Sequence, residues 1–214
     1  MIRYSWLGLI PYAEAWALQR SLFASLIADN TICERVLMCE HPPVITLGRH
    51  ADPHSLLVSP DFLAARSMEA VRIERGGDVT LHAPGQLVVY PIISLRRHRL
   101  GVKDYVRLLE ECVIRTIADF GVKGERVEGA SGVWIGKGTP GERKICALGI
   151  KCSRFVTMHG LALNVCNDLE LFRLINPCGF IDKGVTSLSQ ECGGEIPVAE
   201  VRGRLLHHLS LLLA

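Results

Sequence analysis

The sequence predicts an α+β domain in which helices interrupt a mixed, mostly antiparallel sheet. Three amphipathic stretches lie at the start, middle and end of the chain, and strand-like runs fill the intervals between them. No regular alternation of one strand with one helix is visible, so a series of βαβ units is not expected. The length of 214 residues suits one domain with a substantial core. We therefore expect residues 1–214 to form a single domain.

Each predicted helix carries an apolar stripe at helical spacing and a proline or glycine at one end. The stripes are Ala15, Leu18, Leu22 and Leu26 within Pro11–Asp29, then Val102, Val106, Leu109, Val113 and Ile117, and finally Val198, Val201, Leu205 and Leu209 after Pro197. Gly121 follows the second stripe, where a left-handed residue often ends a helix. These patterns predict a helix at the start, in the middle and at the end of the chain.

The strand candidates are short runs rich in β-branched and aromatic residues, as expected for a half-buried sheet. They are Arg35–Cys39, Val44–Leu47, Val71–Arg75, Leu87–Ile93, Gly132–Ile135, Lys144–Ile150 and His159–Val165. Gly136–Gly141 lies between two of them and contains three glycines and a proline. That composition predicts a hairpin loop.

A glycine-rich segment runs from Arg75 to Gln86 and contains the adjacent residues Gly76 and Gly77. Glycines let a backbone approach a ligand closely, and their N–H groups can bind an oxygen atom. The segment therefore indicates a ligand-binding loop, although two glycines between strands more often form a turn or a bulge. It matches neither G-x-x-x-x-G-K-[ST] nor G-x-G-x-x-G, so nucleotide binding is not supported.

Composition excludes several classes of protein. Apolar residues make up 49% of the chain, charged residues 21%, and the formal charge is +2, which argues against a general nucleic-acid binder. The apolar runs are too short to cross a bilayer, and the amino terminus lacks the pattern of a secretory signal. We expect a cytoplasmic protein whose eight cysteines are thiols. His50 and His54 are separated by Pro53, which spoils a helical ligand pair, so no metal site is expected.

Lys144 and Cys178 carry the clearest chemical signal. Cys178 stands between Pro177 and Gly179, on a turn with little bulk around it. An ammonium nearby would lower the pKa of this thiol and raise its thiolate fraction. The pair indicates a nucleophile and its activator, and the chemistry suggested is acyl transfer through a thioester. Burial in the core is the alternative for any one of the eight cysteines, because free cysteine is among the most buried residue types.

Four further residues compete for roles at such a site. Cys146 is two residues from Lys144 and is expected on the same sheet face, which makes it a rival nucleophile, although a mid-strand thiol is more often buried. Lys151 is a rival for the activating lysine. His82 is either a general base or a hydrogen-bonding wall of the pocket, and His159 has the same two alternatives.

Six motifs occur in order over residues 35 to 190. They are His41–Arg49, Arg75–Gln86 with Tyr90-Pro91 after it, Gly132–Trp134, Lys144–Gly149, His159–Asn164 and Asn176–Gly179. In this order and spacing the chain resembles the lipoyl (octanoyl) transferase family, the octanoyl-[acyl-carrier-protein]:protein N-octanoyltransferases. The resemblance implies a biotin/lipoate protein ligase-like fold, a mixed sheet with flanking helices, in agreement with the α+β prediction.

The resemblance also implies residue roles. Cys178 would form the acyl thioester, and Lys144 would lower the pKa of its thiol and handle the proton. The substrate-binding residues would be Arg75, Gly76, Gly77, Asp78, Val79, Thr80, Leu81, His82, Ala147, Leu148, Gly149, Gly160, Leu161 and Ala162. The family commonly has glycine at Ala83, glutamine at Asp78 and tyrosine at Leu81. Asp78 thus places a carboxylate near the expected site, where it would alter the thiol pKa or point to solvent.

The reaction implied is transfer of an octanoyl group from octanoyl-acyl carrier protein to the lysine of a lipoyl domain, a step of protein lipoylation and lipoate biosynthesis. The expected partners are acyl carrier protein, the lipoyl domains of 2-oxoacid dehydrogenase complexes and the glycine cleavage H protein. No cofactor is expected, because the octanoyl group arrives on the phosphopantetheine arm of the carrier. Carrier proteins are acidic, and the basic candidates for docking them are Arg96, Arg97, Arg99, Lys123 and Arg126.

Three other functions are alternatives. A lipoate or biotin ligase would share the fold, activate its acid with ATP and need no cysteine. A noncatalytic acyl-binding module would form no covalent adduct, and a thioesterase would release free acid. The motif Asn176–Gly179 argues against the first two, because neither needs a thiol on an exposed turn.

Overall fold

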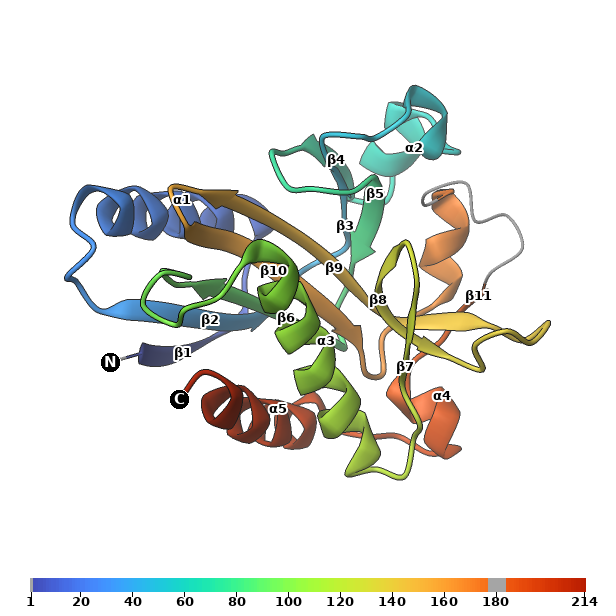
Figure 1. Ribbon diagram of the computed structural model, residues 1–214. Coiled ribbons are helices and arrows are strands. Elements are labelled where there is room, and N and C mark those ends of the chain that lie inside the picture. The colour runs from blue at the N-terminus through green and yellow to red at the C-terminus, as the bar shows by residue number, and fades with distance from the viewer. Residues whose placement is uncertain (1, 177–183) are drawn as a thin grey trace.

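The computed structural model describes residues 2–176 and 184–214 (Figure 1). The helices are α1 (Tyr12–Ala28), α2 (Pro60–Ala64), α3 (Val102–Ala118), α4 (Leu188–Cys192) and α5 (Val198–Leu212), with short 3-10 helices at Pro53–Ser55 and Glu170–Leu174. The strands are β1 (Ile2–Leu9), β2 (Glu34–Glu40), β3 (Val44–Leu47), β4 (Glu69–Arg72), β5 (Val79–His82), β6 (Gln86–Ile92), β7 (Glu125–Val127), β8 (Ala130–Ile135), β9 (Arg143–Ser153), β10 (Val156–Asn164) and β11 (Gly184–Val185).

Within the described residues these strands form one large and one small sheet. The large sheet has the order β1-β2-β6-β10-β9-β8-β7, and β11 pairs with β9 beside this path. The β1–β2 and β11–β9 pairs are parallel, and the other pairs of the large sheet are antiparallel. The small sheet has the order β4-β3-β5. The prediction of an α+β domain with a mixed, mostly antiparallel sheet is confirmed.

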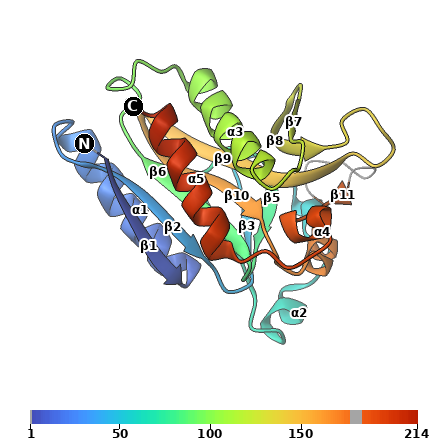
Figure 2. The same cartoon turned by 90° about the horizontal axis from the view of Figure 1, so that it is seen from below.

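The large sheet is covered on both faces. On one face α3 and α5 pack with the buried side chains of the central strands, among them Val36, Val89 and Leu163. Figure 2 shows these two helices lying side by side across the sheet. On the opposite face α1 contributes Ala15, Phe23 and Leu26 to a second core with side chains such as Val88, Tyr90 and Ala162. A sheet buried on both faces explains why β6 and β10 are buried along their whole length.

The small sheet has its own core and lies above the α1 face of the large sheet (Figure 1). Ile45, Val79 and Leu81 pack there with Leu63 of α2. The loop that precedes β5 is tied to both sheets, since the Gly76 N–H donates to the carbonyl of Ile150 in β9 at 2.9 Å. The small sheet therefore forms a roof over part of the large one.

The predicted helices agree closely with α1, α3 and α5, and Gly121 has the expected positive φ of 78°. The apolar stripes are less accurate, because Leu18 and Val102 are exposed, whereas Gln19 and Tyr105 take up buried positions. A pattern of apolar residues does not predict that a polar or aromatic side chain such as Gln19 or Tyr105 faces the core of the protein.

The strand prediction omitted β1, β5, β7 and β11, and it extended β4 too far. The ladder between β3 and β4 ends at Arg72, after which the chain turns toward the large sheet. The segment Arg75–Gln86 was predicted as a loop, but only its beginning is one, since Val79–His82 is β5. The predicted hairpin loop at 136–141 does join the antiparallel strands β8 and β9.

One distortion of the large sheet affects the site. Pro91 lies in the interior of β6 and has no N–H to donate to β10. Opposite it, His159 of β10 has a φ of 59°, and its N–H donates instead to Oε1 of Gln19 in α1 at 3.0 Å. This explains the buried glutamine in α1, whose side-chain oxygen accepts from the His159 N–H in place of a carbonyl of the neighbouring strand.

Candidate active site

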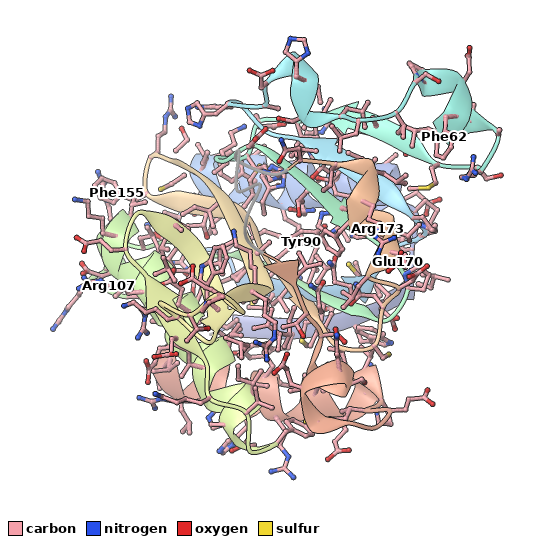
Figure 3. All side chains as sticks on the ribbon, turned by 90° about the vertical axis from the view of Figure 1, so that its right-hand side faces the viewer. Phe62, Tyr90, Arg107, Phe155, Glu170 and Arg173 are labelled. Carbon is pink, nitrogen blue, oxygen red and sulfur yellow. The ribbon has the colours of Figure 1, made fainter. Side chains whose placement is uncertain are left out.

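A cavity of about 530 Å³ lies between the large sheet and the small one. Its floor includes Val88 and Tyr90 of β6 and residues 160–162 of β10, and Tyr12 at the start of α1 forms part of its wall. Figure 3 places Tyr90 in the middle of the molecule, with Phe155, Arg107 and Phe62 toward its margins. This size is typical of a pocket for a small ligand or an acyl group.

Most of the predicted substrate-binding residues line this cavity. They are Arg75, Gly76, Gly77, Asp78, Val79, Thr80, His82, Ala147, Leu148, Gly149, Gly160, Leu161 and Ala162, and Lys144 lines it too. Leu81 does not reach the wall, because it is fully buried in the core of the small sheet. Three segments that are far apart in the sequence thus meet around one space.

Glycines allow the segments to approach closely at two points. A Cβ atom on Gly160 would lie 2.2 Å from the carbonyl oxygen of Val89, and one on Gly149 would lie 2.9 Å from Cδ of Arg75. Neither distance is compatible with a larger residue in this arrangement. The small residues predicted for the acyl slot therefore have a steric reason in the structure.

Arg75 is the buried cation of the roof, with 7% of the residue exposed. Its guanidinium donates to the carbonyl oxygen of Thr46 at 2.7 Å and to the carbonyl of Gly76 at 3.1 Å. These bonds hold the glycine-rich loop to β3. A guanidinium on the cavity wall also supplies positive charge to a site where a carbonyl oxygen becomes negative during acyl transfer.

Lys144 is half-buried on the wall of the cavity, and its ammonium lies 4.5 Å from the centre of the Trp134 ring. A bulge between Val133 and Trp134 in the pairing of β8 with β9 gives β9 one extra residue. As a result Lys144 and Ala147 both line the cavity, although they are three positions apart. A cation over an aromatic face is held in place by the ring's charge distribution.

The same bulge corrects the expectation for Cys146. This residue was expected on the same face as Lys144, but it is fully buried in the core beneath α3 and α5, together with Ile145. Burial raises the pKa of its thiol, an effect larger than the lowering by the nearby Lys144 charge. Cys146 is therefore a packing residue, the alternative expected for a mid-strand thiol.

Lys151 also takes a role different from that of Lys144. Its ammonium donates to a carboxylate oxygen of Glu74 at 3.0 Å, and the side chain is not part of the cavity wall. The ion pair joins β9 to the loop after β4. Among the described residues, Lys144 is thus the lysine that lines the cavity.

Cys178 lies outside the described residues, but the residues on both sides of its segment are linked to the cavity wall. On the N-terminal side, the Asn176 N–H donates to the carbonyl of Ser55 at 2.8 Å, and the Ser55 hydroxyl donates to the Asp78 carboxylate at 2.9 Å. On the C-terminal side, Val185 pairs with Lys144 and lines the cavity. The described residues on the two sides of this segment are thus bonded to the wall, Asn176 through Ser55 to Asp78 and Val185 to Lys144.

Asp78, the departure from the family pattern, has a structural partner. Both of its carboxylate oxygens accept from the Ser55 hydroxyl, at 2.9 and 3.1 Å. Ser55 is itself bonded through its carbonyl to Asn176. The carboxylate thus helps to hold Ser55, the residue to which Asn176 is bonded, two positions before Cys178.

A chain of hydrogen bonds supports His82 on the opposite wall. His82 Nδ1 lies 2.7 Å from Oε1 of Gln86, whose amide nitrogen donates to Oδ1 of Asn164 at 2.8 Å. The amide nitrogen of Asn164 donates to the carbonyl of Thr186 at 3.0 Å, and the Thr186 N–H donates to the carbonyl of Lys144 at 3.0 Å. The series crosses β6 and β10 and ends on the backbone of Lys144.

The histidines of the cavity are held neutral. Burial lowers the pKa of His82 to about 3, and the nearby His41 lowers it further, whereas the bond to Gln86 acts in the opposite direction. Burial also lowers the pKa of His159 to about 4, against the opposing effect of Glu74. Nε2 of His159 has no hydrogen-bond partner among the described residues. The expectation that both histidines belong to the pocket is consistent with their positions on its wall.

An aromatic group completes this wall. His82 stacks on Tyr12 with a centroid distance of 5.9 Å, and His41 packs edge-on against both. His41 is fixed by the carbonyl of Ile10 at 2.7 Å and by the hydroxyl of Tyr90 at 2.8 Å. The sequence motifs did not assign Tyr12, Tyr90, Gln86 or Asn164 to the site. For Gln86 and Asn164 a signal was available, because each is a polar residue at the end of an otherwise apolar strand.

The basic residues considered for carrier docking are partly engaged within the chain. Arg97 pairs with Glu34, and Arg126 pairs with Glu110 and Glu111. Two other candidates also have neighbours: Lys123 lies 3.6 Å from Glu125, and the Arg96 guanidinium lies 4.5 Å from the ring centre of Phe155. None of the candidates belongs to the described wall of the cavity.

The described residues were also compared with the requirements of a metal site and of a membrane span. No group of three or more His, Cys, Asp or Glu side chains is arranged to hold a metal ion there. No helix in that part of the chain is long and apolar enough to span a membrane.

Comparison with known proteins identifies the family. Residues 11–210 match the model of the lipoyl protein ligase A/B catalytic domain. The chain belongs to this family. Its relatives include an octanoyltransferase of Bacteroides thetaiotaomicron, 52% identical over 96% of this chain and 92% of the relative. An octanoyltransferase of Chloroflexus aggregans is 52% identical over 95% of this chain and 90% of the relative.

Solved structures show the same fold at low sequence identity. A bipartite lipoate protein ligase of Thermoplasma acidophilum has a TM-score of 0.76 and 16% identity, with 99% of this chain and 83% of that chain covered. Lipoate-protein ligase A bound with ATP has a TM-score of 0.75 and 16% identity, with 99% and 85% covered. The biotin protein ligase of Aquifex aeolicus gives 0.55 and 13%, with 100% and 69% covered. The expected biotin/lipoate protein ligase-like fold is confirmed.

Proposed function

We propose that the cavity holds an octanoyl thioester and that Cys178 carries the acyl group between two protein substrates. The chain is an octanoyltransferase, an acyltransferase of protein lipoylation and lipoate biosynthesis. The observation that carries the assignment of the nucleophile is the position of Lys144. It lines the cavity and pairs with Val185, seven residues after Cys178 in the sequence. An ammonium at this place lowers the pKa of a thiol that reaches the same space.

In the first half-reaction, the Cys178 thiolate attacks the carbonyl carbon of octanoyl-phosphopantetheine on acyl carrier protein. A C–S bond to the enzyme forms, the C–S bond to the carrier breaks, and the carrier thiolate takes up a proton. Lys144 holds the enzyme thiolate before attack and supplies this proton. The octanoyl chain lies over the small residues of the floor, where Gly160, Ala162 and Ala147 leave an apolar space beside Val88.

In the second half-reaction, the ε-amine of a lipoyl-domain lysine attacks the octanoyl-Cys178 thioester. The new C–N bond forms, the C–S bond breaks, and the extra proton on nitrogen passes to Lys144. Amide formation from a thioester is downhill, so ATP and other cofactors are not needed. The Arg75 guanidinium, on the wall of the cavity, stabilises the negative charge that develops on the carbonyl oxygen.

The partners we propose are acyl carrier protein as donor, and as acceptors the lipoyl domains of 2-oxoacid dehydrogenase complexes and the glycine cleavage H protein. A reactive thiol requires a reducing compartment, so we place the reaction in the cytoplasm. The acidic carrier would approach the rim of the cavity, where Arg49 is exposed and its N–H donates to the carbonyl of Arg75 at 3.0 Å.

Intact-mass spectrometry tests the assignment. The wild-type protein and Cys178→Ser are incubated with octanoyl-carrier protein without ATP, and a lipoyl domain is then added. We expect an increase in mass by one octanoyl group on the wild type, and this group then moves to the lipoyl domain. We expect no such increase on the serine variant. Cys146→Ser is the matched control, because it removes a buried thiol of the same strand as Lys144. Transfer by Cys178→Ser, or a dependence on ATP, would show that the reaction is that of a ligase.

A second measurement tests the role of Lys144. The rate of Cys178 alkylation is followed against pH in the wild type and in Lys144→Met, which keeps the length of the side chain. Loss of the positive charge raises the pKa of the thiol, so the alkylation profile moves to higher pH. An unchanged profile would remove Lys144 from the activation of the nucleophile.

A further inference from the structure

The hydrogen-bond series behind His82 determines which ring nitrogen carries the proton. The carbonyl of Thr186 can only accept, so the Asn164 side chain must direct its amide nitrogen to it. Oδ1 of Asn164 then accepts from the amide nitrogen of Gln86, which also donates to the carbonyl of Leu81 at 3.1 Å. Oε1 of Gln86 therefore faces His82 as an acceptor. The proton of His82 lies on Nδ1.

The consequence is a fixed lone pair on the cavity wall. With Nδ1–H donated to Gln86, the other ring nitrogen of His82, Nε2, is unprotonated. His82 lines the cavity, and no hydrogen bond links its Nε2 to another described residue. Stacking on Tyr12 keeps the ring from rotating. The backbone carbonyls of Leu81 and Thr186 thus determine which ring nitrogen of His82 carries the proton.

The attacking amine needs such an acceptor. A neutral lysine amine must direct its lone pair to the thioester carbon, and its N–H bonds must then be held by acceptors. The Arg75 guanidinium has no acceptor, and the lone pair of Lys144, which has given its proton to the carrier thiolate, takes the N–H whose proton is removed. The second N–H of the amine still needs an acceptor. His82 and Lys144 both line the cavity, His82 from the small sheet and Lys144 from the large one.

We propose that Nε2 of His82 accepts an N–H of the lipoyl-domain lysine during attack on the acyl-enzyme and so orients the amine in the second half-reaction. This inference rests on the proposed function. The proton removed from the amine goes to Lys144, and His82 accepts a hydrogen bond without taking up the proton. The carrier's thioester has no N–H at the reacting atom, so acylation of Cys178 does not need this contact.

The surroundings of the ring favour an acceptor over a base. The titratable and charged groups that face His82 come from every neighbouring element: Tyr12 of α1, His41 after β2, Arg75 before β5, Tyr90 of β6 and His159 of β10. Burial and the nearby His41 lower the pKa of His82 to about 3. The imidazole therefore stays neutral throughout the physiological range, and its lone pair remains available.

The test separates the two half-reactions. His82→Phe keeps an aromatic wall and removes the acceptor, and His207→Phe changes an exposed histidine of α5 as a matched control. Acylation by octanoyl-carrier protein and transfer from the isolated octanoyl-enzyme to a lipoyl domain are each measured in a single turnover. For His82→Phe we expect acylation within ~3-fold of the wild type and transfer slower by ~10- to 100-fold, the usual effect of losing one hydrogen bond to a reacting group.

Transfer at the wild-type rate in His82→Phe would overturn the inference, and so would a loss confined to acylation. Failure of the wild type to form any octanoyl-enzyme would instead contradict the proposed function. Gln86→Met provides a second variant, because it removes the acceptor for Nδ1–H while His82 remains. Its transfer rate is expected to fall in the same half-reaction, as the ring is free to carry its proton on Nε2.

Nitrogen-15 NMR of the histidine-labelled wild type reads the tautomer directly and does not depend on any variant folding. We expect His82 to show a protonated Nδ1 and an unprotonated Nε2 from pH 5 to 8. A proton on Nε2 in this range would refute the inference, since the ring would then present a donor to the cavity.

Discussion

Replacing Gly160 by alanine adds one methyl group at a position that the neighbouring backbone already occupies. The new Cβ would lie 2.2 Å from the carbonyl oxygen of Val89 and 2.8 Å from Cδ of Pro91. The contact with backbone cannot be relieved by a side-chain rotation, and β10 is held to β6 by the ladder that begins at the next residue, Leu161. The strands must therefore separate locally, or the floor of the cavity must deform.

The expected cost is at the upper end of the range for overpacking, ~3 kcal/mol. For a chain of this length, 1 kcal/mol corresponds to a shift in Tm of ~2–4 °C, so Gly160→Ala should melt ~6–12 °C below the wild type. Acylation should slow as well, because Gly160 is part of the cavity wall.

Gly203→Ala is the matched control. Gly203 lies in α5, and a Cβ atom added to it would have nothing within 4 Å, so alanine is accommodated without contact. Alanine is more favourable than glycine in a helix by ~0.5–1 kcal/mol, and this variant should melt above the wild type. Urea denaturation and thermal melting of the two variants measure opposite signs. A Gly160→Ala protein within ~0.5 kcal/mol of the wild type would refute the steric argument, which places the value near ~3 kcal/mol.

Two further predictions concern pH. The folded pKa of His82 is about 3 and that of His159 about 4. At a pH between these values and the ordinary histidine pKa, each imidazole is neutral in the folded protein and takes up a proton when the protein unfolds, which favours unfolding. This stability is complete above pH ~6.5 and falls by up to ~1.4 kcal/mol per pH unit for each ring, so these two rings should contribute a loss of ~3 kcal/mol to urea denaturation between pH 6.5 and 5. His41, whose pKa burial also lowers, adds to the loss. His159→Gln should reduce the loss by the share of one ring, ~1.5 kcal/mol, and an undiminished loss would contradict the assignment. Glu191 titrates at lower pH, because the hydrogen bond from Arg143 lowers the pKa of its carboxyl group. Its contribution to the free energy of unfolding is therefore present above the ordinary carboxyl pKa and is lost as the pH falls through the folded pKa. Glu191→Gln should cost ~1–2 kcal/mol at neutral pH, a partly exposed pair being screened, with a smaller difference from the wild type near pH 3; an equal difference at both values would exclude the ion pair as the cause.

Local features of the sequence were sufficient for much of the fold. The helices α1, α3 and α5 follow from apolar stripes at helical spacing, and the long strands follow from β-branched runs. Those signals depend on neighbouring residues along the chain. Three of the strands that were missed, β5, β7 and β11, have only four, three and two residues. The fourth, β1, is an edge strand that pairs with β2, beyond α1. Short and edge strands carry a weak local pattern, because their pairing depends on partners that folding supplies.

The site illustrates the same distinction. The motifs around Lys144 and residues 75–82 indicated the cavity, and most of those residues line it. The error at Cys146 came from assuming a strict period of two along β9. A bulge depends on hydrogen bonds to the partner strand β8, so no property of β9 alone reveals it.

By itself, the sequence determined the family, the α+β class and the segments that carry the chemistry, because each depends on residue types in a fixed local order. Only the tertiary structure decided which atoms face the cavity and in what chemical form. Gln86 and Asn164 are 78 residues apart, yet their side chains are bonded and together place the proton of His82. The physical reason is that a hydrogen bond is directional and is made across strands, so the state of one ring depends on carbonyls that folding brings beside it.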